Sequence, residues 1–320
     1  MRVSVVVPTH NRPVALERCL TALAAQEFAP DDYEVIVADD AASEATRRQV
    51  RAWADCAAVA IRRVVPTTAH GPAAARNAGW RAARGRIIAF TDDDCVPAPR
   101  WLTEGVGAIE TGAEAASGRV IVPLPKRPTD YERDAAGLQS AEFVTANCLV
   151  RRDALEAVGG FDERYVAAWR EDSDLQFALL ERGFRIIRAP RAVVVHPIRP
   201  APWGVSLRQQ RKSLFNALLY KKFPSRYRLG IQTSPPWGYY ATVGAIATAG
   251  ASLAFGWPTV ALGSAATWTA LTVHFCARRL RGASTAPRHV LEMAVTSVLI
   301  PPLSVFWRLY GALKFRVLFL

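Results

Sequence analysis

The chain of 320 residues is long enough for one large domain or two smaller ones with a buried core. Its net charge of +12 is uneven, because residues 1–200 hold 26 Lys and Arg against 27 Asp and Glu, whereas residues 201–320 hold 14 Lys and Arg and one acid. No charged residue lies between Arg228 and Arg278. A basic and apolar segment suits a membrane with anionic lipids, whereas a nucleic-acid surface would leave the apolar run unexplained.

The first 90 residues alternate between strand and helix patterns. Met1–Pro8 has a short apolar run that stops at a proline, so we expect a first strand rather than a signal peptide. Apolar runs predict strands at residues 2–7, 34–38, 59–65 and 87–90, and helical spacing predicts helices at residues 14–25, 43–55 and 71–83. Such a series predicts an α/β fold with a mostly parallel sheet and helices on both faces. No Gly-x-Gly-x-x-Gly follows the first strand and no Gly-Lys-Ser/Thr loop is present, which argues against a Rossmann site or a P-loop.

The pattern changes after Pro97. It predicts helices at residues 100–110, 152–158 and 175–182, and strands at residues 115–122, 146–150 and 193–197. A charged, proline-rich loop is expected from about residue 124 to 133. The five cysteines form neither a Cys-x-x-Cys pair nor the spacing of a metal site, which favours a reducing compartment.

Three consecutive acids, Asp92, Asp93 and Asp94, follow the apolar run Ile87–Phe90. Strands of an α/β sheet end at the edge where such folds bind ligands. Neighbouring carboxylates repel one another unless a positive group lies beside them, and Mg²⁺ binds one or two carboxylates together with substrate phosphates. The acids therefore predict either a cation site or a solvated acidic turn.

Seven short segments in a fixed order resemble the family 2 glycosyltransferases with the GT-A fold, over about Val3 to Pro224. They are Val5–Arg12, Ala38–Asp40, Ala75–Gly79, Phe90–Asp94, Ala146–Arg152, Gly159–Glu163 and Glu171–Leu175. The resemblance implies a nucleotide-diphospho-sugar transferase with a mostly parallel sheet.

The resemblance also implies a donor site at the edge of the sheet. Asp40, or its neighbour Asp39, would accept hydrogen bonds from the nucleobase, although an Asp-Asp pair is also common in turns. Arg76 could reach the diphosphate, or could be a surface arginine. The expected donor-binding residues are Pro8, Thr9, Asn11, Asp39, Asp40, Arg76, Asn77, Asp92 and Asp93. Residues 41–44 depart from the family's usual Gly-Ser-x-Asp, which leaves the nucleobase open.

A metal ion and a base complete the implied site. Asp92 and Asp94 resemble the family's DxD motif, which holds Mg²⁺ or Mn²⁺ on the donor diphosphate, and His196 resembles a histidine that joins the metal ligands in several members. Asp172 matches the family's catalytic base, which implies inversion at the sugar. Taken alone, the acids around Asp172 would indicate a helix N-terminus.

Residues on the acceptor side are expected from the same resemblance. They are Glu171, Trp169, Arg208 and Arg211. A lipid phosphate is already ionised and has little need of a base, whereas a hydroxyl must lose its proton. The acids at Glu171 and Asp172 therefore favour a hydroxyl acceptor.

The C-terminal third predicts a membrane region. Residues 206–222 form either an interfacial helix or an ordinary amphipathic docking helix. Residues 239–255 and 259–275 are each about long enough to cross a bilayer at about 1.5 Å per residue. Residues 290–307 are a third crossing or a re-entrant or interfacial segment, because two prolines lie in the middle and basic residues follow.

The expected organisation has three parts. They are a cytoplasmic GT-A catalytic domain at residues 1–200, an interfacial helix and linker at 201–230, and a transmembrane region at 231–320. We expect an inner-membrane, inverting, metal-dependent enzyme that moves sugar from a nucleotide-sugar donor to the hydroxyl of a lipid-linked or membrane-proximal acceptor in envelope glycan or glycolipid synthesis. Its partners would be donor, acceptor and membrane lipids, but no nucleic acid. The alternatives are transfer to polyprenyl phosphate, nucleotidyl transfer, and an inactive membrane-docked scaffold.

Overall fold

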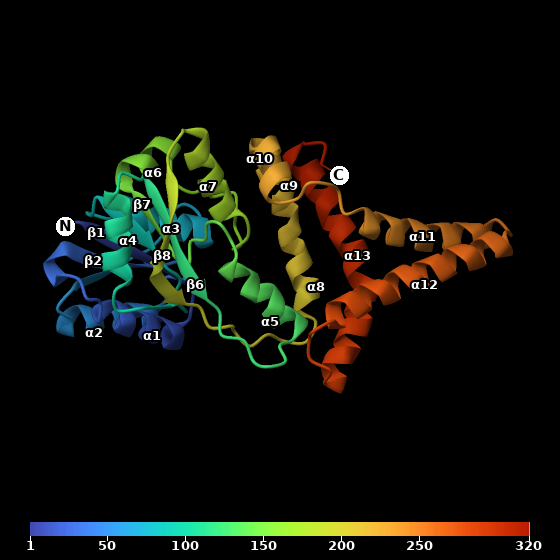
Figure 1. Cartoon of the computed structure of the whole chain (residues 1–320), viewed down its shortest axis with the longest axis horizontal. Coiled ribbons are helices and arrows are strands. Elements are labelled where there is room, and N and C mark those ends of the chain that lie inside the picture. Colours follow the sequence, from blue (N-terminus) through green and yellow to red (C-terminus); the bar gives the residue numbers. More distant parts are fainter. Residues whose placement is uncertain (320) are drawn as a thin grey trace. The chain divides into compact units, whose positions relative to one another are not determined.

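The computed structural model describes residues 1–319 (Figure 1). The chain divides into two compact units. The first unit comprises Met1–Pro123 and Ala136–Ile198, and the second comprises Leu124–Ala135 and Arg199–Leu320. The short segment 124–135 thus leaves the first unit in the middle of the sequence and joins the second. The expected roles of the three parts, cytoplasmic, interfacial and transmembrane, stay predictions.

The first unit is built on one sheet of eight strands in the order β3-β2-β1-β4-β7-β6-β8-β5. The strands are β1 (Val3–Thr9), β2 (Tyr33–Asp39), β3 (Ala60–Val64), β4 (Ile87–Phe90), β5 (Val96–Pro97), β6 (Ala115–Ile121), β7 (Cys148–Arg151) and β8 (Ile186–Val195). Four neighbouring pairs are parallel, β1 with β2, β1 with β4, β2 with β3 and β6 with β8. Strand β7 is antiparallel to both β4 and β6, and β5 is antiparallel to β8, so the sheet is mixed.

This pairing determines which strand ends meet. Strands β1, β2 and β4 are parallel, and two antiparallel steps through β7 return β6 and its parallel partner β8 to the same direction. The carboxyl ends of β1, β2, β4 and β8 therefore share one edge of the sheet. Loops that follow these four strands can bring their side chains together.

Helices cover both faces of the sheet, as expected. In the first unit they are α1 (Pro13–Ala24), η1 (Pro30–Asp32), α2 (Glu44–Cys56), α3 (Pro72–Ala82), α4 (Trp101–Glu110), η2 (Ala136–Gln139), α6 (Arg152–Val158) and α7 (Glu171–Glu181). Val5 and Val7 pack with residues of α1 and α4, whereas Val6 packs with residues of α3, α6 and α7. Side chains alternate between the faces of a strand, so each face of β1 has its own apolar core.

Two element boundaries differ from the sequence prediction in ways that matter for the site. Helix α7 begins at Glu171 rather than Leu175, because its first turn includes Glu171, Asp172 and Asp174, and acids are favoured at a helix N-terminus. Strand β8 begins at Ile186 rather than Val193. Its first half contains a proline and two arginines, which do not follow the apolar pattern of a strand.

The second unit is helical. Its elements are α5 (Asp130–Ala135), α8 (Val205–Gln209), η3 (Gln210–Leu214), α9 (Phe215–Lys222), α10 (Pro224–Gly230), α11 (Trp237–Ala254), α12 (Pro258–Leu280) and α13 (Pro287–Phe315). The expected helix at 206–222 is the run α8–η3–α9. Among the described residues, α12 and α13 are the two helices long and apolar enough to cross a membrane. Helix α11, with 18 residues, covers residues 239–254 of the expected span 239–255 but is not one of these two.

Helix α13 continues through Pro301 and Pro302 without a break. Proline removes a backbone donor and usually kinks a helix unless surrounding contacts hold it. Buried residues flank the prolines on both sides, from Thr296 to Gly311, so packing keeps the helix intact. The two prolines therefore do not divide the segment into two pieces.

Candidate active site

The side chains of the three acids after β4 have two different sets of partners. Asp93 is buried and accepts a hydrogen bond from the Thr9 hydroxyl at 2.8 Å and another from Arg12 at 3.1 Å. Asp92 and Asp94 instead join Cys95 and His196 in a group whose ligand atoms all lie within 4.8 Å of one another. Asp93 thus fixes the loop to the end of β1, while its neighbours face the group at the end of β8.

The donor atoms of this group suit a hard divalent cation. Two carboxylates and one imidazole match the oxygen-rich ligand sets of Mg²⁺ and Mn²⁺, whereas the thiol of Cys95 is a soft ligand that these ions do not prefer. Asp94 is 5% exposed, and its carboxylate lies 3.7 Å from His196 Nε2. The expected ligands Asp92, Asp94 and His196 are therefore brought together, although their binding of an ion stays a prediction.

Arg76 connects this group to the acids of α7. Its side chain is 3% exposed, and it donates to Asp92 at 2.7 Å and to Glu171 at 3.1 Å. Its guanidinium also lies 5.8 Å from the centre of the Phe161 ring. One buried cation from α3 thus holds a carboxylate after β4 and a carboxylate of α7 in fixed positions.

Glu171 and Asp172 form a pair of neighbouring carboxyl groups at the start of α7. Burial and the adjacent Asp172 raise the pKa of Glu171 to about 7, although Arg76 opposes the shift. Burial also raises the pKa of Asp172, which accepts a hydrogen bond from the Ser173 backbone at 2.7 Å. A carboxyl pair with raised pKa values takes up a proton more readily than an ordinary carboxylate, which is the property required of a general base.

Trp169, two residues before α7, is 37% exposed. The guanidinium of Arg170 stacks over its ring at 4.6 Å, and Arg170 has a positive φ of 76°. This aromatic surface therefore borders the carboxyl pair along the chain.

The two acids after β2 have different surroundings. Asp39 is fully buried and binds Arg63 at 2.8 Å together with the backbone N–H of Ser43 at 2.9 Å. Asp40 accepts a hydrogen bond from the Gly71 backbone, and the exposed rings of His10 and His70 flank its carboxylate at 3.2 and 3.3 Å. Asp40 is thus the member of the pair that lies near the surface.

Other expected donor-site residues have mainly internal contacts. Asn77 is buried, and its amide donates to the Phe161 carbonyl and to Glu163 while accepting from the indole of Trp80. These bonds anchor the loop before α7 to α3, so the structure gives Asn77 a positioning role. Pro8 lies within β1, and Asn11 is exposed with a positive φ of 55°.

Arg208 and Arg211 belong to the second unit. Arg208 is exposed on α8, and Arg211 lies over the ring of Trp307 at 5.8 Å. Their expected role beside the acceptor stays a prediction.

Sequence reasoning missed several residues that support the site. They are His10, Arg12, Arg63, His70, Cys95 and Glu163. His10 and Arg12 each lie next to the expected donor residue Asn11, and that position was the available signal for these two. His70 lies six residues before Arg76 and had no such signal. Arg63 lies in β3 and Glu163 lies 86 residues from its partner Asn77, so their pairing follows from the fold.

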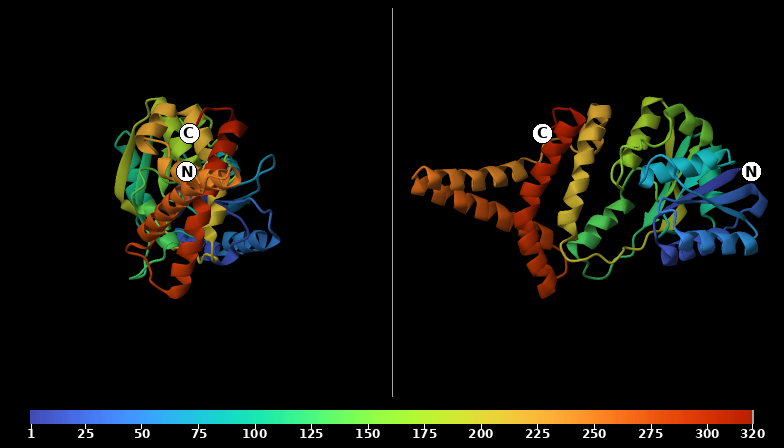
Figure 2. Two further views of the ribbon diagram at one scale, coloured as in Figure 1. Left: turned by 90° about the vertical axis from the view of Figure 1, so that its right-hand side faces the viewer. Right: turned by 180° about the vertical axis from the view of Figure 1, so that it is seen from behind.

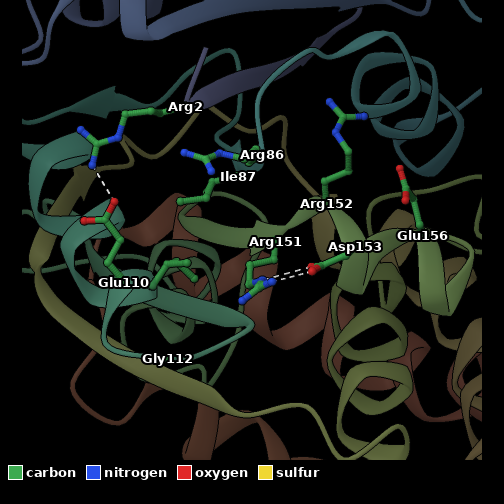
Figure 3. Close-up of a pocket in the computed structure, with 10 residues that line it drawn as sticks. Arg2, Arg86, Ile87, Glu110, Gly112, Arg151, Arg152, Asp153 and Glu156 are labelled. Atoms are coloured by element: carbon green, nitrogen blue, oxygen red, sulfur yellow. Dashed lines mark hydrogen bonds and ion pairs between the residues drawn. The ribbon is translucent and has the colours of Figure 1, made fainter.

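A separate cavity of about 450 Å³ lies at the opposite edge of the sheet (Figure 3). Arg2 and Ile87 line it at the amino ends of β1 and β4, and Arg151 lines it at the carboxyl end of the antiparallel β7. Figure 3 shows Arg151 paired with Asp153. This cavity therefore does not belong to the group of acids at the carboxyl edge.

Comparisons with known proteins agree on one family. The family model described as Glycosyl transferase family 2 matches residues 4–159, and that of Glycosyl transferase family group 2 matches residues 130–307. The glycosyltransferase AglE of Haloferax volcanii is 30% identical over 218 residues, which cover 65% of this chain and 70% of that protein. The validoxylamine A glucosyltransferase of Streptomyces hygroscopicus subsp. limoneus is 38% identical over 106 residues, which cover 33% of this chain but only 23% of its own length.

A mannosyltransferase from Pyrobaculum calidifontis, solved with GDP-Man and Mn²⁺, has a similar fold. The TM-score is 0.57 at 23% identity, over 98% of this chain and 87% of that chain. The mixed sheet, its helices and this neighbour define the GT-A fold of nucleotide-diphospho-sugar transferases. The chain belongs to glycosyltransferase family 2, and it is a glycosyltransferase. The expected fold class and family are confirmed.

Proposed function

We propose that the protein is an inverting, metal-dependent glycosyltransferase that uses a nucleotide-sugar donor and the hydroxyl of a lipid-linked or membrane-proximal acceptor. The observation that carries the proposal is one connected site: the group of Asp92, Asp94 and His196 is joined through Arg76 to the carboxyl pair that starts α7. Such a site combines groups for a diphosphate with a group that accepts a proton.

The donor would bind across the carboxyl edge of the sheet. Mg²⁺ or Mn²⁺ held by Asp92, Asp94 and His196 would supply Lewis-acid stabilisation of the diphosphate as it leaves. The Mn²⁺ found with GDP-Man in the Pyrobaculum neighbour supports this role. Asp40 is the better candidate for contact with the nucleobase, because the carboxylate of Asp39 is already bound to Arg63 in the interior.

Asp172 would act as the base. It would take the proton of the acceptor hydroxyl while that oxygen attacks the anomeric carbon from the face opposite the leaving group. The bond to the diphosphate breaks with its electron pair leaving on the nucleotide, so the configuration at the sugar inverts. Arg76 fixes Glu171 and Asp92 relative to each other, which keeps the base and the leaving-group side in a constant geometry.

The proposed location is the cytoplasmic face of the cell membrane. The long apolar helices of the second unit and the 14 Lys and Arg beyond residue 200 support membrane attachment beside anionic lipids. An acceptor carried by the membrane would then be present at high local concentration. Synthesis of an envelope glycan or glycolipid is the process we propose.

The test is donor binding by the detergent-purified protein with a panel of nucleoside diphosphates, with and without Mn²⁺. We expect one diphosphate to bind in a metal-dependent way and Asp94→Asn to abolish that binding. Asp153→Asn is the matched control, because Asp153 is an exposed acid of the same unit in an ion pair with Arg151. Diphosphate binding of equal strength with and without Mn²⁺, and in wild type and Asp94→Asn, would refute the metal-dependent site.

A further inference from the structure

Helix α13 packs against the run α8–η3–α9 and the residue before it over most of its length, from Glu292 to Phe315. Near the start of α13, Glu292 accepts a hydrogen bond from the Gly204 backbone at 2.7 Å. Further along, Gly311 lies so close to Leu214 that an added Cβ would come within 2.5 Å of the Leu214 carbonyl oxygen. At the end of α13, the Phe315 carbonyl accepts a hydrogen bond from Lys221 at 2.8 Å. One face of α13 is therefore covered by protein from Glu292 to its end.

The opposite face of α13 is apolar and exposed. Its exposed side chains recur every three or four residues, the spacing of one helix face. They are Leu291, Val295, Val298, Leu299, Phe306, Leu309, Tyr310 and Leu313, and Leu313 is 78% exposed. The covered face instead includes polar groups such as Arg308, which is 4% exposed and donates to Gln232 at 3.0 Å. Helix α13 is thus two-sided along its length.

Helices α11 and α12 form a hairpin whose base lies on α13. Arg279, at the end of α12, donates to Thr296 at 2.7 Å and to Ser297 at 3.2 Å. The segment that leads into α11 contacts α13 through the hydrogen bond between Gln232 and Arg308. These contacts are eleven or more residues apart, or roughly 17 Å along α13 at 1.5 Å per residue.

The hairpin extends away from α13 on the side opposite α8 and α9 (Figures 1 and 2). Its outer surface is apolar, with Leu253, Phe255 and Leu262 each at least 67% exposed. Helix α12 has 23 residues, or about 34 Å, which is enough for the roughly 30 Å hydrocarbon core.

We infer that α13 lies in the plane of the membrane, with its exposed face in the outer part of the lipid leaflet that the α11–α12 hairpin enters. This inference rests on the membrane attachment in the proposed function. A helix that runs across the base of a crossing hairpin cannot cross the same bilayer beside it. We take the lipid as the occupant of the apolar face, because the hairpin that would enter the same bilayer also exposes large apolar side chains, Leu253, Phe255 and Leu262 among them.

Polar groups mark the level of the lipid headgroups. A cavity of about 400 Å³ at the base of the hairpin is lined by Tyr239 and Arg278, by Arg279 with its partner Asp130, and by a second acid, Asp134. Exposed basic residues stand at both ends of α13, Arg288 at the start and Lys314 at the end. Basic side chains at this depth attract anionic headgroups, and a tyrosine suits the interface between water and lipid.

The first experiment compares the two ends of α13. Cys56 and Cys276 are replaced by Ser, and the buried cysteines stay. Single cysteines are then introduced by Arg288→Cys, Lys314→Cys and, at the tip of the hairpin, Trp257→Cys. A membrane-impermeant maleimide is applied to oriented vesicles. We expect the two ends of α13 to react from the same side and the hairpin tip to react from the other.

Labelling of the two ends from opposite sides would overturn the inference and leave the membrane anchor intact. Release of the whole protein by alkaline carbonate would instead refute the anchor in the proposed function and, with it, this inference. The two failures are therefore distinguishable.

A second measurement does not depend on vesicle orientation. Leu291→Cys, Leu299→Cys and Leu313→Cys are labelled with a fluorophore, and quenching by lipids spin-labelled at different depths is compared. A helix in the plane gives the same shallow depth at all three positions. A helix that crosses the bilayer gives the greatest depth at the middle position, and that result would overturn the inference.

Discussion

At the residue scale, we expect the carboxyl group of Asp172 to decide which acceptor chemistry the site can perform. Asp172→Asn keeps the size of the side chain but removes its basicity, so we expect kcat toward a hydroxyl acceptor to fall by about 10²–10⁴-fold while donor binding is retained. The measurement is initial rate with purified enzyme and natural membranes as the acceptor source. Glu181→Gln at the exposed end of the same helix is the control. Retained activity in Asp172→Asn would favour an acceptor phosphate, which needs no base.

We expect the same pair, Glu171 and Asp172, to determine the pH dependence of the reaction. The pKa of Glu171 is raised to about 7 by burial and by Asp172, so below this pH the pair holds an extra proton and less of the ionised base is present. We therefore expect kcat to fall as the pH decreases through about 7. Glu171→Gln removes a negative charge beside Asp172, so Asp172 can ionise at a lower pH. The fall of kcat on the acidic side of the pH profile should therefore occur at a lower pH in this variant. If kcat of Glu171→Gln falls at the same pH as that of the wild type, another group determines this pH dependence.

Sequence alone predicted which residues meet at the carboxyl edge better than it predicted what each one touches. Acids at strand ends are visible in the sequence, because strand patterns and Asp residues can both be read directly. The partners of Asp39 and Asn77 are not visible, because Arg63 and Glu163 come from other elements. Side-chain direction in a three-residue run also depends on those partners, as the Thr9 bond of Asp93 shows.

At the scale of elements, the position of α3 depends on a close contact with β1. A Cβ added at Gly79 would lie 2.4 Å from Cγ1 of Val6, which is fully buried. We expect Gly79→Ala to lower the free energy of unfolding by about 2 kcal/mol, since overpacking forces side chains and backbone to move. Arg76 lies one turn earlier on α3, so kcat should fall as well. Thermal unfolding and initial rates are the measurements.

Gly107→Ala is the matched control for this substitution. Gly107 is also within a helix, α4, and an added Cβ there meets nothing within 4 Å of the described structure. Alanine restricts the unfolded chain and favours helix, so a gain of about 0.5 kcal/mol is expected. Equal destabilisation by the two substitutions would contradict the account of the α3 contact.

Element boundaries were predictable where one pattern dominated and less so where patterns were mixed. The strands at the centre of the sheet are continuous apolar runs, and their expected positions agree with the structure to within about two residues. Strand β8 begins seven residues earlier than expected because its first half carries Arg188, Pro190 and Arg191. Helix α5 was expected as loop, since six residues give too short a window for helical spacing.

At the scale of the whole chain, α5 is tied to residues far along the sequence. Asp130 on α5 accepts hydrogen bonds from Arg279 at 2.8 and 3.0 Å, and Arg279 is 8% exposed. Asp130→Asn leaves a buried cation without its carboxylate, so we expect a loss of about 3 kcal/mol and faster proteolysis of residues 124–135 in detergent. Asp153→Asn, which breaks an exposed pair, should cost less than about 1 kcal/mol. Equal protease sensitivity in the two variants would contradict this role.

The separation between Asp130 and Arg279 also sets an order of events during biosynthesis. The two residues are 149 positions apart. At a synthesis rate of about 5–20 residues per second, α5 leaves the ribosome roughly 7–30 s before its partner exists. During that interval strands β7 and β8 are made and can complete the sheet, while the carboxylate of Asp130 still lacks its partner Arg279. The last contacts of this segment can therefore form only after the α11–α12 hairpin has been synthesised, so a segment made before the middle of the chain is fixed in place by one of the last parts to be made.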